Sequence, residues 1–206
     1  MTPKSKLTQI ILASTSRARR EMLAAAGVPF TVEAAEVDEP AIRARLLGEK
    51  VPSKPPQIAE ALARAKAEDV SRRHKGALVI GGDQVLALGS ELLTKAKNTA
   101  AARATLERLR GRVHELHSAV ALAADGKVLW AHTGTARLKM RDFSDAFLDD
   151  YLIRAGERIQ QSVGAYELEG LGVQLFETIE GDYFTILGLP LLPLLAELRA
   201  QGMVPA

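Results

Sequence analysis

Residues 9–27 read QIILASTSRARREMLAAAG, and this stretch decides the fold class. The short apolar run Gln9–Ala13 is typical of a buried strand, and it leads directly into Ser14-Thr15-Ser16. A helix is predicted over Arg17–Ala26, with Ser16 as its N-cap and Gly27 as its stop. A strand that leads straight into a helix indicates an α/β protein.

Further strands and two hairpins extend this first unit. Strands are predicted over Val28–Ala35 and Ala77–Leu88, and a polar turn over Glu36–Pro40. Asp125-Gly126 is a strong hairpin signal between the runs 113–123 and 127–138. A second hairpin is predicted around Glu180-Gly181-Asp182, between Val173–Ile179 and Tyr183–Leu187. Because hairpins are antiparallel, the predicted sheet is mixed.

Helices alternate with these strands and are expected to flank the sheet. Their predicted ranges are Gln57–Arg73, Asn98 as cap through Leu109, Ser144 as cap through Arg154, and Leu191–Gln201. At roughly 150 residues per domain, a chain of 206 residues fits a single domain. The proline-rich KVPSKPP (50–56) is the best internal boundary and predicts a hinge.

The composition excludes several classes of protein. Lys plus Arg is 27 and Asp plus Glu is 25, so the formal charge of +2 argues against a basic nucleic-acid coat. No cysteine is present, which excludes disulfides and thiolate metal sites and fits a reducing compartment. No apolar run approaches the roughly 20 residues that span a bilayer. We expect a cytoplasmic enzyme that associates with no membrane.

The junction between the first strand and helix offers an anion site. Ser14 and Ser16 precede the helix, and Arg17, Arg19 and Arg20 lie in its first turn. Free N–H groups at a helix N-terminus attract phosphate, and arginine adds a two-pronged donor. The alternative is a capped helix with a solvated basic face. Three cations at the positive end of a helix are a local conflict, which favours function.

Carboxylates and lysines elsewhere could complete such a site. Asp83 interrupts an otherwise buried strand, so it must be paired, hydrogen-bonded or bound to metal, unless it ends the strand at a turn. The acidic EVDEP (36–40) could bind a hard cation, or be a surface turn. Lys95 and Lys97 could simply be solvated. The glycine-rich GAYELEGLG (164–172) indicates an irregular functional loop or a turn.

Other familiar sites do not occur in the sequence. The four histidines show no zinc-binding spacing. GxGxxG, Walker A and GxSxG patterns are absent, which disfavours a Rossmann site, a P-loop and a serine hydrolase.

Taken in order, several motifs resemble the Maf (septum-formation) family of nucleoside triphosphate pyrophosphatases over about residues 9–201. The motifs are LASTSRARREML, EVDE, ALARAKA, IGGDQV, LLTKAKN, GAYELEGLG and GDYFTILGLPL. The resemblance implies a two-lobed α/β fold with a mixed central sheet, flanking helices and an active-site cleft between the lobes. It also implies a cytoplasmic, divalent-metal-dependent enzyme, often dimeric, that converts a nucleoside triphosphate to the monophosphate and pyrophosphate.

The resemblance also assigns roles to individual residues. Ser14, Ser16 and Arg19 would hold phosphate, while Lys66 and Lys95 would neutralise the phosphate chain. Glu39 and Asp83 would be the acidic pair at the magnesium or manganese ion and the attacking water, with Asp83 as the proton acceptor. Glu169 would lie near the base. Proton acceptor, cations and metal are what water attack on phosphorus requires.

Departures from the family pattern bear on the base. The subgroup that resembles dTTP/UTP pyrophosphatases shows Ser-Pro-Arg-Arg where this chain has Ser16-Arg17-Ala18-Arg19. Glu169 and the strand sequence GGDQV are more similar to the 7-methyl-GTP subgroup. We therefore expect a purine or modified guanine substrate. The alternatives are a dTTP/UTP pyrophosphatase, a nucleic-acid-binding module and a silent nucleotide sensor, and a stable nucleic-acid partner is not expected.

Overall fold

The computed structural model describes residues 7–50 and 52–205. Its first half contains β1 (Gln9–Ala13), α1 (Arg17–Ala25), β2 (Thr31–Val32), α2 (Glu39–Leu47), α3 (Pro55–Arg73), β3 (Ala77–Leu88), β4 (Glu91–Leu93) and α4 (Thr99–Leu109). Its second half contains β5 (Val113–Ala124), β6 (Lys127–Met140), α5 (Asp145–Ala155), β7 (Phe176–Glu180), α6 (Tyr183–Ile186) and α7 (Leu191–Ala200). Two 3₁₀ helices, η1 (Gly156–Gln161) and η2 (Leu171–Leu175), precede β7.

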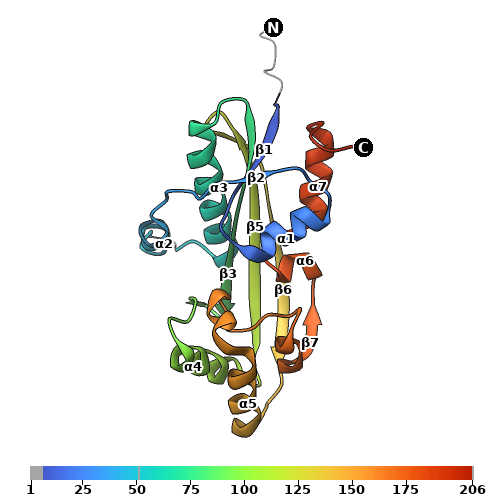
Figure 1. Ribbon diagram of the computed structural model, residues 1–206. Helices are drawn as coiled ribbons and strands as arrows, with labels where there is room; N and C mark the ends of the chain where they lie inside the picture. The colour runs from blue at the N-terminus through green and yellow to red at the C-terminus, as the bar shows by residue number, and fades with distance from the viewer. Residues whose placement is uncertain (1–6, 51, 206) are drawn as a thin grey trace.

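The strands form one mixed sheet, as predicted, in the order β2-β1-β3-β5-β6-β7, with β4 paired to β3. β1 is parallel to both β2 and β3, whereas β3, β5, β6 and β7 pair antiparallel. The long strands β3, β5 and β6 run through the molecule as its axis (Figure 1). The α/β class and the hairpin at Asp125-Gly126 are therefore confirmed.

Helices cover both faces of the sheet because the strand residues alternate. Ile11, Ala13 and Val79 belong to the cluster under α3, whereas Leu12 and Ile80 belong to the cluster under α1 and α7. Figure 1 shows α3 on one side of the strands and α1, α6 and α7 on the other. This packing fixes where the first turn of α1 and the middle of α3 lie relative to β3.

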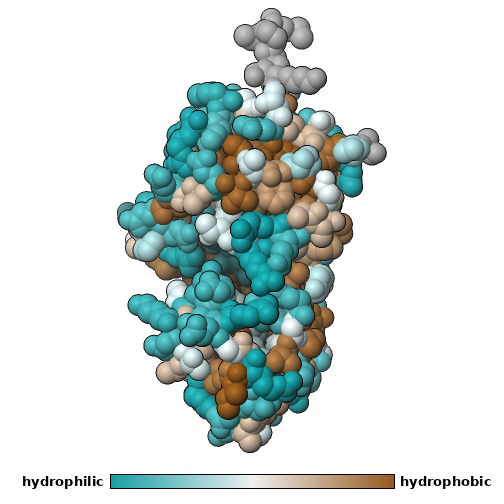
Figure 2. Space-filling view, viewed as in Figure 1, coloured by the Kyte–Doolittle hydropathy of each residue, from teal (hydrophilic) through white to brown (hydrophobic). Residues whose placement is uncertain are grey.

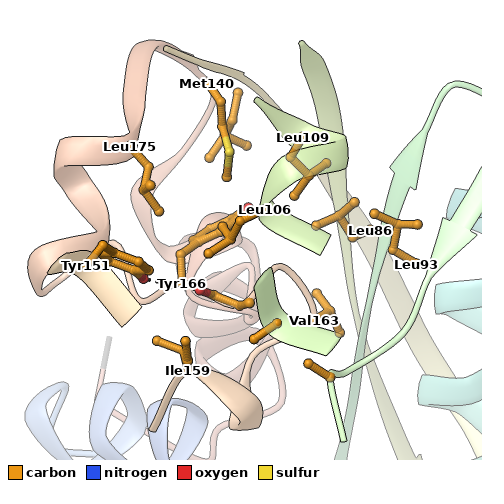
Figure 3. Packing of buried hydrophobic residues seen from close by; sticks show 14 of the residues in the cluster. Leu86, Leu93, Leu106, Leu109, Met140, Tyr151, Ile159, Val163, Tyr166 and Leu175 are labelled. Carbon is orange, nitrogen blue, oxygen red and sulfur yellow. Dashed lines mark hydrogen bonds between the residues drawn. The ribbon is translucent and has the colours of Figure 1, made fainter. Parts of the chain in front are cut away.

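A third apolar cluster fills the opposite end of the long strands, where α4 and α5 lie. Leu106 and Leu109 of α4 and Tyr151 of α5 pack there with Val163 and Tyr166 from the loop after η1 (Figure 3). Tyr151 Oη donates a 3.1 Å hydrogen bond to the backbone oxygen of Ala165, which ties this loop to α5. The cluster thus supports the glycine-rich segment that the sequence singled out.

Local capping explains the helix starts. Ser16, Asn98 and Ser144 cap α1, α4 and α5 with their side chains, as predicted. Gly27, with φ +70°, follows the end of α1 as its stop. The hinge expected at 50–56 stays a prediction, and its Val51 lies outside the described residues.

Three sequence predictions are wrong in part. The second hairpin does not form: β7 ends at Glu180, and Asp182 caps α6 by accepting a 2.7 Å bond from the Thr185 backbone N–H. The strand predicted over Val28–Ala35 shrinks to the two residues of β2. The turn predicted at Glu36–Pro40 instead starts α2, because Asp38 accepts a 2.9 Å bond from the Ala41 N–H.

Candidate active site

The sheet register brings the main polar segments together. Ala13 at the end of β1 pairs with Gly81, so the chain enters the Ser14–Ser16 turn level with the residues just before Asp83. A pocket of about 870 Å³ opens at this level, which is the size of a small-ligand site. Every residue to which the family resemblance assigns a role lines it: Ser14, Ser16, Arg19, Glu39, Lys66, Asp83, Lys95 and Glu169. The surface is hollowed at mid-height between hydrophilic side chains (Figure 2).

The first turn of α1 forms the donor-rich wall of the pocket. Ser14 Oγ accepts bonds from the Ser16 backbone N–H at 3.3 Å and from Arg19 Nη1 at 3.1 Å. Arg19 Nε donates to the Gly188 backbone oxygen at 2.8 Å, which leaves Nη2 without a hydrogen-bond partner among the described residues. Burial lowers the pKa of Arg19, opposed by the charges of Asp83 and Glu39. The guanidinium is therefore fixed, with donors left for an anion.

Two glycines in β3 make this close packing possible. A Cβ at Gly81 would lie 2.2 Å from the Ala63 backbone oxygen, so only glycine lets α3 approach the strand. A Cβ at Gly82 would lie 3.1 Å from Arg19 Nε. The pair therefore brings Lys66 of α3 and Arg19 of α1 to opposite sides of Asp83.

Lys66 holds two carboxylates together. Its Nζ lies 2.7 Å from Asp83 Oδ1 and 2.8 Å from Glu39 Oε1. Burial acts to raise the pKa of Glu39, but the hydrogen bond and charge of Lys66 outweigh it and lower that pKa. The Asp83 side chain is only 6% exposed. Lys66 therefore pairs with the two carboxylates in this structure, whereas the sequence predicted only a contact with the phosphate chain.

Asp83 keeps one oxygen unused. Asp83 Oδ2 is buried and has no hydrogen-bond partner among the described residues. Arg43, one helical turn after Glu39 on α2, places Nη2 3.6 Å from Asp83 Oδ2 and 3.6 Å from Glu39 Oε2. A buried carboxylate oxygen without a partner is costly, so this atom is a candidate acceptor for a ligand proton.

Lys95 follows β4 and lines the same pocket. Although the residue is exposed, partial burial of its ammonium lowers its pKa, and the charges of Arg19 and Lys66 lower it further. A cation surrounded by other cations is stabilised by an incoming anion. Lys95 therefore fits a polyanionic ligand better than it fits a structural role.

The glycine-rich loop lines the rest of the pocket. Glu167 pairs with Arg158 at 2.9 Å, whereas Glu169 makes no ion pair or hydrogen bond within the described residues. Below them, Tyr166 Oη lies 2.8 Å from Nε2 of the buried His114, whose pKa is lowered by burial to about 4. The neutral imidazole and the phenol thus anchor the loop that carries the unpaired carboxylate.

Two pocket residues escaped the sequence reasoning. Gln84 donates 2.9 Å bonds to Ser118 Oγ and to the Ile186 backbone oxygen, and so fixes the segment that ends in Gly188. Arg43 gave no signal because the sequence predicted no helix or strand for its segment, which follows the turn expected at Glu36–Pro40 and forms α2. Once α2 is known, Arg43 can be recognised as a site residue, because it follows Glu39 by four residues and so lies on the same face of the helix.

Among residues 7–50 and 52–205, no group of three or more His, Cys, Asp and Glu side chains is placed to hold a metal ion. In the same part of the chain, no helix combines the length and apolarity needed to cross a bilayer.

Comparison with known proteins identifies the family. A sequence model described as Maf-like protein matches residues 9–201, which include every site residue named above. The chain belongs to the Maf family. The resemblance inferred from the ordered motifs is therefore confirmed.

Curated relatives match 95–99% of this Maf chain. A protein of Rhizobium etli named 7-methyl-GTP pyrophosphatase is 52% identical over 204 residues, which cover 99% of each chain. A 7-methyl-GTP pyrophosphatase of Brucella abortus is 49% identical over 95% of this chain and 98% of its own. A nucleoside triphosphate pyrophosphatase of Paramagnetospirillum magneticum is 52% identical over 95% of this chain and 100% of its own.

Proposed function

We propose that this protein hydrolyses a nucleoside triphosphate to the monophosphate and pyrophosphate, with a modified guanine nucleotide such as 7-methyl-GTP preferred. One observation carries the proposal: a single pocket sets the donor wall of Ser14, Ser16 and Arg19 against the Asp83–Glu39 pair. The names of the relatives support the reaction, and those at 52% and 49% identity from Rhizobium and Brucella support the base. Nucleotide-pool sanitising is the role that fits this reaction.

The donor wall and Lys95 would hold the triphosphate. Backbone N–H groups at the start of α1 and the free Nη2 of Arg19 suit phosphate oxygens. The residues that line the pocket carry six positive and five negative charges, a net charge of +1. Four of the cations, Arg19, Arg43, Lys66 and Lys95, act on the carboxylates of Asp83 and Glu39, so the positive surplus is concentrated there. This surplus draws in a triphosphate, which carries about four negative charges at neutral pH.

Asp83 would accept the proton of the attacking water. Lys66 fixes Oδ1, and Oδ2 is the atom left to take a proton. The water oxygen bonds to the α-phosphorus, the bond from that phosphorus to the bridging oxygen breaks, and pyrophosphate leaves. Arg19 and Lys95 would stabilise the charge that gathers on the departing pyrophosphate.

A divalent cation fits the acidic pair, because the buried Asp83 Oδ2 has no hydrogen-bond partner in the part of the chain that the structure describes, and Lys66 holds Glu39 beside Asp83. Asp83 and Glu39 would hold magnesium or manganese, which usually takes one or two carboxylates with substrate phosphates and water. When bound, the ion would neutralise phosphate charge and lower the pKa of a bound water.

Glu169 and Ala18 would face the base. An ionised carboxylate only accepts hydrogen bonds, so Glu169 favours a base edge that offers donors, such as N1–H and N2–H₂ of guanine. Thymine and uracil offer one N–H flanked by two carbonyls. The small Ala18 leaves room beside the ring on the α1 side.

We also propose a cytoplasmic homodimer that binds nucleic acid at most transiently. The absence of cysteine supports the compartment, and the family resemblance supports the dimer. Sedimentation equilibrium of the purified protein tests the assembly, and a monomer at all concentrations would contradict it.

The decisive experiment is a nucleotide panel with magnesium or manganese. Incubation with 7-methyl-GTP, GTP, dTTP and UTP should release pyrophosphate and the monophosphate, fastest with 7-methyl-GTP. Orthophosphate as the first product would overturn the reaction. Fastest turnover of dTTP or UTP would favour the alternative base class, and binding without turnover across the panel would favour a silent sensor.

A further inference from the structure

Arg43 carries hydrogen-bond donors that the protein does not use. Its side chain is 22% exposed and lines the pocket. Among the described residues its guanidinium makes no hydrogen bond, and its two ion-pair contacts, to Glu39 and Asp83, are both 3.6 Å long. A guanidinium presents five N–H donors, and in an arginine that is mostly buried several of them normally form hydrogen bonds.

A purely structural role explains this geometry poorly. The acidic pair already has a close counter-ion, since Lys66 contacts both carboxylates at 2.7 and 2.8 Å. Charge-assisted hydrogen bonds of arginine are usually about 2.7–2.9 Å long and often paired. At 3.6 Å, Arg43 lies beside the carboxylates without bonding to either. The contact compensates part of the carboxylate charge while leaving the donors of Arg43 available.

The geometry points to Arg43 as a substrate-contacting residue that donates to the α-phosphate, the phosphate that water attacks next to Asp83. This inference rests on the proposed function. Asp83 Oδ2 marks the position of the water, and Arg43 Nη2 lies 3.6 Å from that oxygen. Arg19 and Lys95 lie on the other walls, where the pyrophosphate portion would lie. Glu39 and Arg43 share α2, so one helix brings both an acid and a donor to the reacting phosphate.

Direct binding of the two products separates this role from others. Calorimetric titrations with 7-methyl-GMP and with inorganic pyrophosphate are compared for wild type, R43M and R43K. R43M should bind 7-methyl-GMP about 10- to 100-fold more weakly, because a hydrogen bond to a charged group is lost. Its pyrophosphate affinity should stay unchanged. R43K keeps the positive charge but lacks the paired N–H donors of a guanidinium. Its affinity for 7-methyl-GMP should therefore fall less, by about threefold to tenfold.

The matched control is R45M, on the same helix. Arg45 is exposed, lies outside the pocket, and pairs among the described residues only with Glu49 at 3.3 Å, so R45M should bind both products like wild type. With substrate, R43M should lower kcat about 10²-fold, with a smaller change in KM, because a donor to the reacting phosphate is missing.

Several results would overturn the inference. Unchanged 7-methyl-GMP affinity in R43M does so, as does a loss confined to pyrophosphate or shared equally by both products. If the melting temperature of R43M lies well below that of wild type, the titration of R43K decides instead. An R43K protein that binds 7-methyl-GMP as tightly as wild type overturns the inference too. Because the titrations need no turnover, a wild type that binds both products but hydrolyses nothing contradicts the proposed function and leaves the Arg43 measurement readable.

Discussion

Lys66 Nζ donates a 2.7 Å hydrogen bond to Asp83 Oδ1, and this contact joins α3 to the middle of β3 inside the pocket. Both side chains are nearly buried, at 12% and 6% exposure. An ion pair this enclosed is costly to break by removing one partner, because the other charge is left buried. The pair therefore links the stability of the fold to the chemistry of the site.

Replacing Lys66 with methionine should destabilise the protein by about 2–3 kcal/mol, since Asp83 loses its close partner and keeps, among the described residues, only the 3.6 Å ion-pair contact with Arg43. The double variant K66M/D83N should regain about 1–2 kcal/mol, because the unpaired charge is gone. Urea unfolding measures both. K139M, which removes a 2.9 Å pair with Glu177 at the exposed surface, should cost under about 1 kcal/mol. Equal losses in K66M and K139M would contradict the buried-pair argument.

Asp83→Asn should preserve the fold and abolish most turnover. The amide oxygen can still accept from Lys66, whose charge stays paired with Glu39 at 2.8 Å, so the melting temperature should change little. The amide group, however, can no longer take a proton. The rate of pyrophosphate release should fall by about 10²–10⁴-fold. Asp150→Asn, which alters an exposed aspartate paired with Arg154 on α5, serves as the control. A folded D83N enzyme with a near-normal rate would place the base elsewhere, with Glu39 as the next candidate.

Short-range signals carried most of the fold prediction. Ser16, Asn98 and Ser144 were recognised as caps because the bond that defines a cap lies within three residues. The Asp125-Gly126 hairpin was likewise local. Asp182 shows the limit of such signals: the same Glu-Gly-Asp sequence can close a hairpin or cap a helix, and the tertiary setting makes it cap α6.

The site was only partly predictable for a related reason. Arg19 stood out because cations conflict with the positive end of a helix, and Asp83 because a carboxylate conflicts with a buried strand. The roles of Lys66, Lys95 and Glu169 came only from the resemblance to the Maf family. The Lys66–Asp83 bond depends on how closely α3 approaches β3 at Gly81, which no local pattern encodes. Arg43 depends on α2, a helix whose apolar residues are spread around its axis and therefore give almost no periodic signal.

Acid should destabilise the protein through His114. Burial lowers the pKa of His114 from 6.5 to about 4. Between pH 6.5 and pH 4 the histidine is therefore protonated in the unfolded chain but neutral in the folded protein. Stability is therefore present above pH 6.5 and falls as the pH drops towards 4. From neutral pH to about pH 4.5 this loss should be about 2–3 kcal/mol. Urea unfolding of wild type and H114F at both pH values measures the difference, because other acid-sensitive groups cancel. Parallel pH dependence in the two proteins would contradict this assignment.

Glu169 should decide between base classes. It is the carboxylate in the glycine-rich loop without a partner among the described residues, whereas Glu167 is paired with Arg158. Glu169→Gln supplies a donor and an acceptor in place of an acceptor alone, so it should match the carbonyl-flanked N–H of uracil and thymine better. We expect kcat/KM to fall about tenfold for 7-methyl-GTP, since one hydrogen bond to a charged group is lost. For UTP and dTTP we expect kcat/KM to rise, since the amide can donate to a base carbonyl. Glu157→Gln, an exposed change on η1 outside the pocket, should leave both values unaltered. A wild type that prefers dTTP or UTP, with no shift in E169Q, would show that Glu169 does not contact the base.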